Sequence, residues 1–194
     1  MAIIKDNVWV EGASGGARKG SIVYRQRAGA TIVGGRPSPS STPATESQLA
    51  HRERFNMATV YAKLALQSEQ LGPQYREAAS GRVSAYNVAV RDKMTPPSID
   101  GVMMDDYTGA AGSRIYVVAH DDFALKSVTV SIQNQFGAVQ QEGEATIAED
   151  RGAYVYELTA DVTGTGLVVV KIIAEDLAGN QTEYQVEVSA ETGL

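Results

Sequence analysis

The hydrophobic pattern of this chain changes its period at Pro96-Pro97, and this change restricts the fold more than any other feature of the sequence. From about residue 46 to the two prolines, apolar residues recur every three or four residues, which is the spacing of an amphipathic helix. After them, apolar and polar residues alternate with the period of two that is typical of β-strands. The sequence therefore predicts an α+β chain of two domains, residues 1–95 and 96–194.

The second domain is predicted to be all-β. Short alternating runs separated by turns that contain Gly or Asp predict strands at residues 98–103, 113–120, 127–133, 145–148, 153–160, 167–174 and 182–189. This many short strands in roughly ninety-five residues is typical of an antiparallel β-sandwich. The stretch 167–173 is the most continuously apolar, so we expect it to form a central strand.

The first domain is predicted to be a β-ribbon followed by a helical hairpin. Runs at residues 7–12, 20–27 and 30–34 predict strands that have too few large apolar residues for a core of their own. Prolines 37, 39 and 43 then predict an extended connector.

The helical hairpin is predicted from capping and spacing signals. Thr45-Glu46-Ser47-Gln48 matches a capping box, which predicts a first helix that runs to about residue 70. We expect the core side of this helix to be formed by Phe55, Ala58, Ala62 and Ala65, with Met57, Tyr61 and Leu64 beside them. Gly72-Pro73 predicts a break, followed by a single second helix that carries Tyr75, Ala79, Val83, Tyr86 and Val90.

Charge is unevenly distributed along the chain, whose formal net charge is -6. Residues 1–97 hold 13 Lys and Arg against 7 Asp and Glu, whereas residues 98–194 hold 4 against 16. The two parts therefore carry formal charges of +6 and -12. Such polarity bears on association rather than on fold. We expect the basic half to face nucleic acid or the acidic half of a neighbouring copy.

The ribbon contains two sets of candidate binding residues. Its basic arm consists of Arg18, Lys19, Arg25, Arg27 and Arg36, with no acidic residue among them. These charges either protect an exposed strand edge from aggregation or bind phosphates or an acidic protein surface. The large apolar residues of the ribbon are too many for a solvent-facing surface and predict an interface with another chain. We assign this interface to Trp9, Ile22, Tyr24, Ile32 and Val33.

The composition excludes much enzymatic chemistry. The chain has no Cys and only two His, which excludes disulfides, cysteine nucleophiles and multi-histidine metal sites. Gly12-Ala13-Ser14-Gly15-Gly16 matches the G-x-S-x-G pattern, but a strand rather than a helix is expected to follow it, which is the wrong context for a nucleophile elbow. The same loop lacks the order of a P-loop. The sequence therefore predicts a non-enzymatic protein without a cofactor.

Three acidic pairs lie near the ends of expected strands: Asp105-Asp106, Asp121-Asp122 and Glu175-Asp176. Loop carboxylates that converge at the ends of a sandwich could hold calcium, which takes about six to eight oxygen ligands. No EF-hand or RTX spacing is present. We therefore interpret the pairs as turn residues and charges that resist aggregation, with a calcium site as the alternative.

Two segments of the second domain resemble bacterial immunoglobulin-like modules. They are residues 117–121 (VVAHD) before 125–130 (LKSVTV), and residues 174–182 (AEDLAGNQT) near the end. In that family the second segment is a turn before the last strand, so the resemblance implies that Asp176 bonds the backbone and that Gly179 or Asn180 takes a positive φ. Such modules are spacers, adhesive units and decorations on cell-surface and phage-virion proteins. The resemblance implies a fold rather than an activity.

The first domain resembles the N-terminal region of small uncharacterised proteins from Bacteroidota and their phages. The matching residues are 12–20 (GASGGARKG), 22–26 (IVYRQ) and 29–33 (GATIV), although Ala30 stands where that pattern has a basic residue. This resemblance implies a small protein without enzymatic motifs that belongs to an assembly.

These observations favour a non-enzymatic structural subunit of a larger assembly. A phage virion structural or decoration protein fits best, docking through residues 1–95 on other copies of itself and on other subunits. The alternative is a binding module, for nucleic acid through the basic arm or for polysaccharide through the sandwich loops. No long apolar stretch is present and charges follow soon after the start, so we expect neither a membrane span nor a signal peptide. The expected location is the virion, with the cytoplasm as the alternative.

Overall fold

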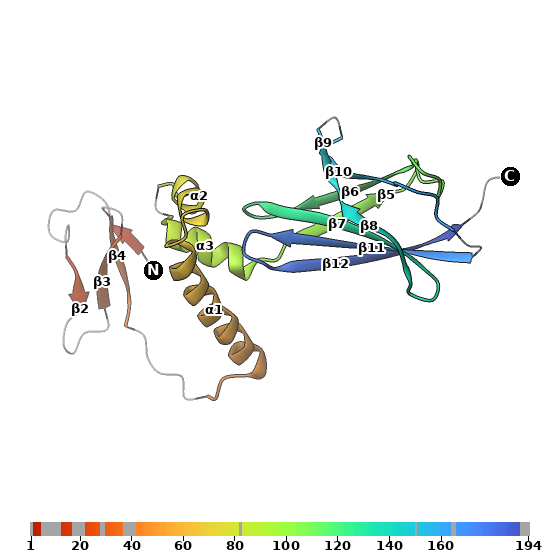
Figure 1. Cartoon of the computed structure of the whole chain (residues 1–194). Coiled ribbons are helices and arrows are strands. Elements are labelled where there is room, and N and C mark those ends of the chain that lie inside the picture. Colours follow the sequence, from red (N-terminus) through yellow and green to blue (C-terminus); the bar gives the residue numbers. More distant parts are fainter. Residues whose placement is uncertain are drawn as a thin grey trace.

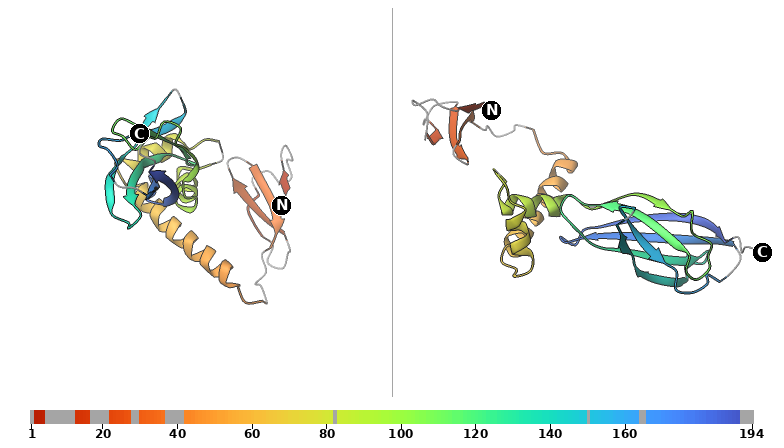
Figure 2. Two further views of the ribbon diagram at one scale, coloured as in Figure 1. Left: turned by 90° about the vertical axis from the view of Figure 1, so that its right-hand side faces the viewer. Right: turned by 90° about the horizontal axis from the view of Figure 1, so that it is seen from above.

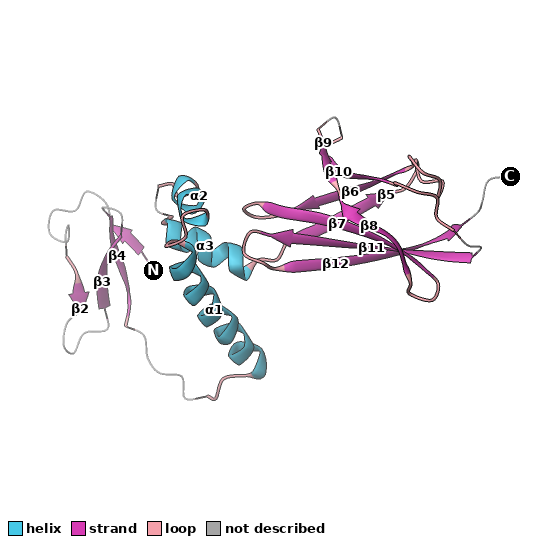
Figure 3. Ribbon diagram, viewed as in Figure 1, coloured by secondary structure: helices cyan, strands magenta, loops and turns pink. Residues whose placement is uncertain are grey.

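The computed structural model describes residues 2–4, 13–16, 22–27, 30–36, 42–81, 83–149, 151–163 and 166–190. Along the chain these residues form a small sheet, a group of helices and a larger β-rich part, so the fold is mixed and mostly β (Figure 1). Figure 3 shows the helices as a layer between the two β-parts, at one end of the larger one. None of the described helices is long and apolar enough to cross a membrane.

The N-terminal sheet is antiparallel, with the strand order β1-β4-β3-β2. Its strands are β1 (Ala2–Ile4), β2 (Gly15–Gly16), β3 (Ile22–Arg27) and β4 (Ala30–Gly35). The sequence predicted β3 and β4, whose pairing places Tyr24 opposite Val33. It did not predict β1 or β2, because strands of three and two residues are too short to show a period. The strand expected at residues 7–12 lies outside the described residues.

Three helices follow: α1 (Glu46–Ala65), α2 (Leu71–Glu77) and α3 (Ala85–Met94). The predicted capping box of α1 is confirmed, because the backbone N–H of Gln48 donates to Thr45 Oγ1 at 3.3 Å and that of Thr45 donates to Gln48 Oε1 at 3.2 Å. The single second helix was wrong. Helix α2 ends at Glu77, Gly81 then takes the left-handed region with a φ of 57°, and Ser84 caps α3 by accepting from the backbone N–H of Asn87.

The larger β-part consists of two four-stranded antiparallel sheets. One has the order β5-β6-β10-β9 and comprises β5 (Ser98–Met103), β6 (Arg114–His120), β9 (Thr146–Ala148) and β10 (Ala153–Glu157). The other has the order β12-β11-β7-β8 and comprises β7 (Leu125–Asn134), β8 (Val139–Glu144), β11 (Gly166–Asp176) and β12 (Gln181–Ala190). All seven predicted strands are present, and β11 lies between two neighbours as expected. Strand β8 was missed because its sequence, VQQEGE, is almost entirely polar.

The two sheets share one apolar core. Ile115 and Val117 of β6 and Tyr156 of β10 pack in the same cluster as residues of β7 and β11. In β11, Val170 and Ile172 are fully buried, whereas Val169, Lys171 and Ile173 are half-buried, as a period of two requires. Figure 2 shows the strands of both sheets running along the length of this part of the molecule.

The helices contact one end of this sandwich-like arrangement, opposite the end where β12 finishes (Figure 1). Lys93 Nζ of α3 donates to the carbonyl of Ala178 at 2.9 Å, in the turn between β11 and β12. The Thr182 hydroxyl donates to the carbonyl of Pro97 at 2.6 Å. The rings of Tyr75 and Phe123 stack with centroids 4.8 Å apart. These contacts hold the helices against the turns of the sheets, and they surround the candidate site.

Candidate metal centre

Three aspartates that are far apart in the sequence meet where the helices contact the sheets. Asp92 belongs to α3, Asp121 to the loop between β6 and β7, and Asp176 is the last residue of β11. One carboxylate oxygen of each lies within 4.8 Å of those of the other two. We call this group the aspartate cluster.

Asp176 is completely buried and organises the turn that leads into β12. Its Oδ1 accepts from the backbone N–H of Asn180 at 2.7 Å, and its Oδ2 accepts from Asn180 Nδ2 at 2.6 Å. Gly179 takes a φ of 74° in the same turn. The turn expected from the sequence is therefore confirmed. Burial raises the pKa of Asp176, and the hydrogen bonds from Asn180 partly offset this effect.

Asp121 is half-buried and caps its own loop. Its Oδ2 accepts from the backbone N–H groups of Phe123 at 2.8 Å and Ala124 at 3.0 Å, the pattern by which Asp stabilises tight turns. Its Oδ1 is buried and has no hydrogen-bond partner among the described residues. One oxygen of this side chain therefore stabilises the turn, and the other is available to bind a ligand.

Asp92 is the least expected member because it lies on a helix and is only 1% exposed. The Tyr75 hydroxyl donates a short hydrogen bond to its Oδ2, and the Tyr61 and Tyr75 hydroxyls are 2.8 Å apart. Oδ1 of Asp92 is buried without a partner in the part of the chain that the structure describes. Burial, which the hydrogen bond from Tyr75 partly offsets, and the charges of Asp176 and Asp121 together raise the pKa of Asp92 to about 6.

Lys93 provides a positive charge beside the cluster. It lowers the pKa of both Asp92 and Asp176, although its Nζ donates to the carbonyl of Ala178 rather than to a carboxylate. Its Nζ also lies 5.7 Å from the ring centroid of Tyr61. Three ionised carboxylates beside one ammonium group leave two negative charges without compensation.

The acidic pairs of the sequence are only partly brought together. Asp121 and Asp176 enter the cluster, whereas Asp122 pairs with Arg91 at 3.4 Å and Glu175 with Lys126 at 2.5 Å. The third pair, Asp105-Asp106, is not part of the cluster, and Asp106 lies 3.8 Å from an arginine nitrogen. The interpretation as turn residues is therefore correct for Asp121 and Asp176, but it does not account for the proximity of their carboxylates to that of Asp92.

Asp92 was missed because a lone Asp in a helix normally faces solvent. A signal was available in its position. It follows Val88 and Ala89 by four and three residues, so it lies on the same helix face as these buried residues. An acid on an apolar face is the pattern that could have identified it.

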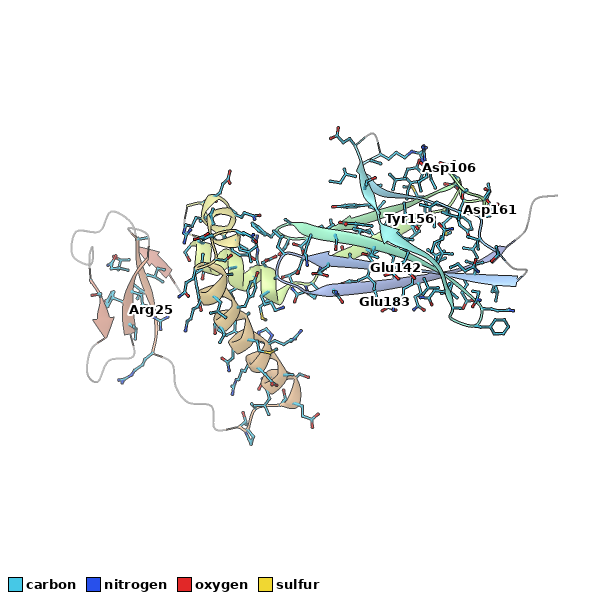
Figure 4. All side chains as sticks on the ribbon, in the orientation of Figure 1. Arg25, Asp106, Glu142, Tyr156, Asp161 and Glu183 are labelled. Atoms are coloured by element: carbon cyan, nitrogen blue, oxygen red, sulfur yellow. The ribbon has the colours of Figure 1, made fainter. Side chains whose placement is uncertain are left out.

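Four of the five residues predicted for an interface are described, and they lie in strands β3 and β4. Ile22 is 47% exposed, whereas Tyr24, Ile32 and Val33 are half-buried, and Trp9 lies outside the described residues. In the basic arm, Arg25 and Arg36 are exposed, and Figure 4 labels Arg25 in the N-terminal sheet. Arg27 ends β3, and Arg18 and Lys19 lie outside the described residues.

Helix α1 carries an apolar face that the sequence did not indicate. Ala58, Ala62 and Ala65 are buried as expected, in the helix that packs against α3. Large apolar residues that were expected beside or within that core side are instead exposed, Met57 at 57% and Leu64 at 63%. The exposed apolar residues of α1 are Leu49, Phe55, Met57, Val60 and Leu64. The expectation was wrong for Phe55, Met57 and Leu64, because only the small alanines fit where α1 and α3 lie close together.

An open groove of about 790 Å³ lies on the side of the sandwich formed by β8, β9 and β10. Tyr116 and Tyr156 line it together with Ile147, which is 68% exposed. Its acidic residues are Glu142, Glu144, Glu149 and Glu157. Figure 4 labels Glu142 and Tyr156 on this side of the molecule. We call it the acidic groove.

Comparison with known proteins identifies no family for this chain. No family model matches it, and no curated protein matches it. Among solved structures, CopC from Methylosinus trichosporium OB3b is similar with 18% identity and a TM-score of 0.35, over 48% of this chain and 91% of that one. An engineered protein is similar with 16% identity and a TM-score of 0.34, over 57% of this chain and 30% of that one. At these TM-scores, neither similarity indicates a function.

Proposed function

We propose that the chain is a non-enzymatic structural subunit of a larger assembly, such as a phage virion structural or decoration protein, and that its N-terminal half docks on another copy. The exposed apolar face of α1 is the observation that carries this proposal. Residues 96–194 act in it as an immunoglobulin-like module, and residues 1–95 act as the anchor. The two sheets around one core and the Asp176 turn support this division.

The exposed face of α1 is an unusual feature for a helix surrounded only by water. Every residue from 46 to 57 is exposed. The first half of this 20-residue helix therefore buries little surface against the described part of the chain. Leu49, Met57, Val60 and Leu64 are spaced by eight, three and four residues and form one row. Contiguous apolar surfaces of this kind mark interaction sites. A partner that covers the row would also stabilise the helix, which is marginal alone.

The acidic groove of a second copy is the partner surface that we assign to this face. Arg52, Arg54 and Lys63 of α1 are exposed, although Glu46 and Glu53 offset part of their charge. The groove offers four glutamates, of which Glu157 pairs with Arg114 at 2.9 Å, together with exposed Ile147. It therefore keeps a net negative charge and complements both the charge and the apolar character of α1. An amphipathic helix that enters an apolar groove is a common mode of recognition.

This contact joins two different surfaces of the same chain. Such head-to-tail contacts close into rings when the rotation allows it and otherwise form open filaments. When α1 of each copy enters the groove of the other, the same contact forms a two-fold dimer, so the assembly is expected to contain two or more copies.

Size-exclusion chromatography with light scattering tests the proposal on the full chain. We expect a mass of two or more copies at physiological salt, and smaller species for Met57→Gln with Leu64→Gln, because both residues lie in the exposed row. Glu142→Gln with Glu144→Gln should have the same effect through the groove. Phe136→Gln is the control, since Phe136 is 86% exposed but belongs to neither surface. A wild-type chain that is monomeric across the accessible concentrations contradicts the proposal.

A gel-shift assay separates this proposal from the nucleic-acid alternative. We expect no duplex binding at physiological salt. Tight binding that falls steeply with salt, and that Arg25→Ala with Arg36→Ala weakens, would favour the alternative, because phosphate contacts release counterions.

A further inference from the structure

We propose that Asp92, Asp121 and Asp176 bind one calcium ion, which joins helix α3 to two turns of the sandwich. This site is independent of the docking surfaces described above. The three carboxylates come from three separate elements, so a shared cation would connect all of them at once.

The unpartnered oxygen of Asp92 points to a missing ligand. Asp92 is 1% exposed, and its Oδ1 has no hydrogen-bond partner among the described residues, while Tyr75 occupies the other oxygen. A buried polar atom without a partner is costly, and buried charges are normally paired or bound to a metal. Asp121 Oδ1 is in the same condition. The cluster therefore contains two buried carboxylate oxygens, from two different elements, that have no hydrogen-bond partner among the described residues.

The charge of the cluster fits a divalent cation. Three carboxylates lie beside Lys93, whose ammonium group is already bonded to the carbonyl of Ala178. Two negative charges are left over, and one divalent cation would balance them. Without the ion, each carboxylate is held near two like charges in a poorly hydrated place. With it, the same arrangement becomes a set of ligands.

The geometry and the ligand type favour calcium. Two oxygens that bind one Ca²⁺ at about 2.3–2.6 Å can be no more than about 5 Å apart, and the cluster satisfies this limit at 4.8 Å. All three ligands are oxygens, whereas soft transition metals prefer His or Cys. Mg²⁺ requires near-ideal octahedral geometry at about 2.0–2.1 Å, which a site assembled from a helix and two turns is poorly suited to provide. Ca²⁺ tolerates irregular geometry, and water or carbonyl oxygens can complete its shell.

Hydrogen bonds around the cluster show what calcium would stabilise. Asn180 Nδ2, which donates to Asp176, also lies 3.2 Å from the backbone carbonyl of Asp92. The Tyr61 hydroxyl lies 3.4 Å from the carbonyl of Leu177. A cation at the centre would thus lock α1, α3 and the turn before β12 into one orientation.

Thermal unfolding of the full chain in EDTA, CaCl2 or MgCl2 tests the site. At a free calcium concentration about one hundred times the Kd measured by calorimetry, the midpoint should rise by roughly 5–10 °C. Magnesium at the same concentration should give a smaller rise. No heat and no shift with millimolar calcium overturns the proposal, and an equal or larger shift with magnesium overturns the assignment to calcium.

Asp92→Asn distinguishes a ligand from a structural side chain. This variant should lose the calcium-dependent shift, and in EDTA it should unfold at the same temperature as the wild type or higher, because it removes one of three facing charges. A structural carboxylate would instead give a lower midpoint in EDTA and an unchanged calcium shift. The matched control is Asp122→Asn, which alters the exposed neighbour of Asp121 outside the cluster and should retain the full shift.

Terbium luminescence provides a direct readout on the unaltered chain. Tb³⁺ replaces Ca²⁺ in oxygen sites, and Tyr75, whose hydroxyl bonds to Asp92, is placed to sensitise its emission. We expect green emission on excitation of tyrosine, and loss of this emission when calcium is added in excess. Emission that calcium does not displace, or no sensitised emission from a folded chain, contradicts the site.

Discussion

The described residues form two buried hydrophobic clusters, which are built from different kinds of residues. In the sandwich, large aliphatic side chains from both sheets meet in one apolar core, and Ile115, Ile132 and Ile172 are completely buried. In the helices, the buried apolar residues are mainly alanines, packed around Tyr75. A buried carboxylate, Asp92, accepts a hydrogen bond from this tyrosine. One core is therefore apolar and the other contains an ionisable group.

The difference indicates where each part obtains its stability. Burial of Ile and Val removes much apolar area from water, whereas burial of Ala removes little. The alanines allow α1 and α3 to approach closely, but they leave the helices dependent on contacts with the sheets, such as the stacked pair Tyr75 and Phe123. We therefore expect the sandwich to be self-sufficient and the helices to rely on the sandwich and on the cation.

Separation of the two parts should produce the largest effect. A fragment of residues 96–194 should unfold cooperatively on its own, because it retains the whole apolar core. A fragment of residues 1–95 should be partly unfolded or aggregated, because its helices lose every contact with the two sheets of the sandwich. Circular dichroism during heating measures both. The fragment 96–194 should also lack the calcium shift, because it lacks Asp92. A cooperative unfolding transition of monomeric 1–95 would show that the helices do not depend on the sandwich for their stability.

Ile172→Ala should be the most damaging single substitution of these predictions. Ile172 is completely buried in β11, and removal of such a side chain leaves a cavity that costs about 2–5 kcal/mol of unfolding free energy. Urea denaturation of the full chain measures this loss. Val169→Ala, in the same strand but half-buried on its other face, should cost clearly less. Equal losses would mean that the inner face of β11 is not the main source of stability.

Tyr75→Phe tests the polar character of the helical core. The substitution retains the ring that stacks on Phe123 but removes the hydroxyl, which leaves a second oxygen of Asp92 unpaired. Loss of one partner from a buried polar pair costs about 1–3 kcal/mol. Urea denaturation should show a smaller loss for Tyr61→Phe, because Tyr61 is half-buried. If the two variants lose the same unfolding free energy, the hydrogen bond from Tyr75 to Asp92 contributes no more to stability than the hydroxyl of Tyr61 does.

The contrast between the two parts also explains which elements the sequence could predict. Strands of the sandwich alternate because one face is buried, so seven of them were found, while polar β8 was not. Local signals were reliable where a side chain bonds its own backbone, as in the Thr45 capping box and the Asp176 turn. The break at Gly81 was missed because apolar residues continue at helical spacing across it.

The aspartate cluster could be predicted only in part, because it depends on packing between distant segments. Asp121 and Asp176 were singled out as loop carboxylates, but no local pattern says that they face each other. Asp92 joins them only because α3 packs against the two turns. The exposed row of α1 was missed for a related reason, since the helix has two apolar faces and the sequence does not show which one is buried.

The smallest effect is expected on the outer face of the sandwich, at the ion pair of Lys171 and Glu183, whose charged atoms are 2.8 Å apart. The hydrogen bond from Lys171 lowers the pKa of Glu183 below its ordinary value of about 4.5. A carboxylate whose pKa is lowered by folding stabilises the fold above its unfolded pKa, and this contribution is lost as the pH falls through the lowered value.

Lys171→Gln should therefore reduce stability slightly at pH 7 and not at all once the pH lies well below the lowered pKa of Glu183, where this carboxyl is protonated in both states. Exposed pairs contribute little because water and salt screen them. NMR titration should show the Glu183 carboxyl midpoint rising toward its ordinary value in Lys171→Gln but not in the control Glu187→Gln, which alters another exposed acid of β12. A loss at pH 7 as large as that of Tyr75→Phe would mean that surface charge, and not the character of the buried clusters, distinguishes the two parts.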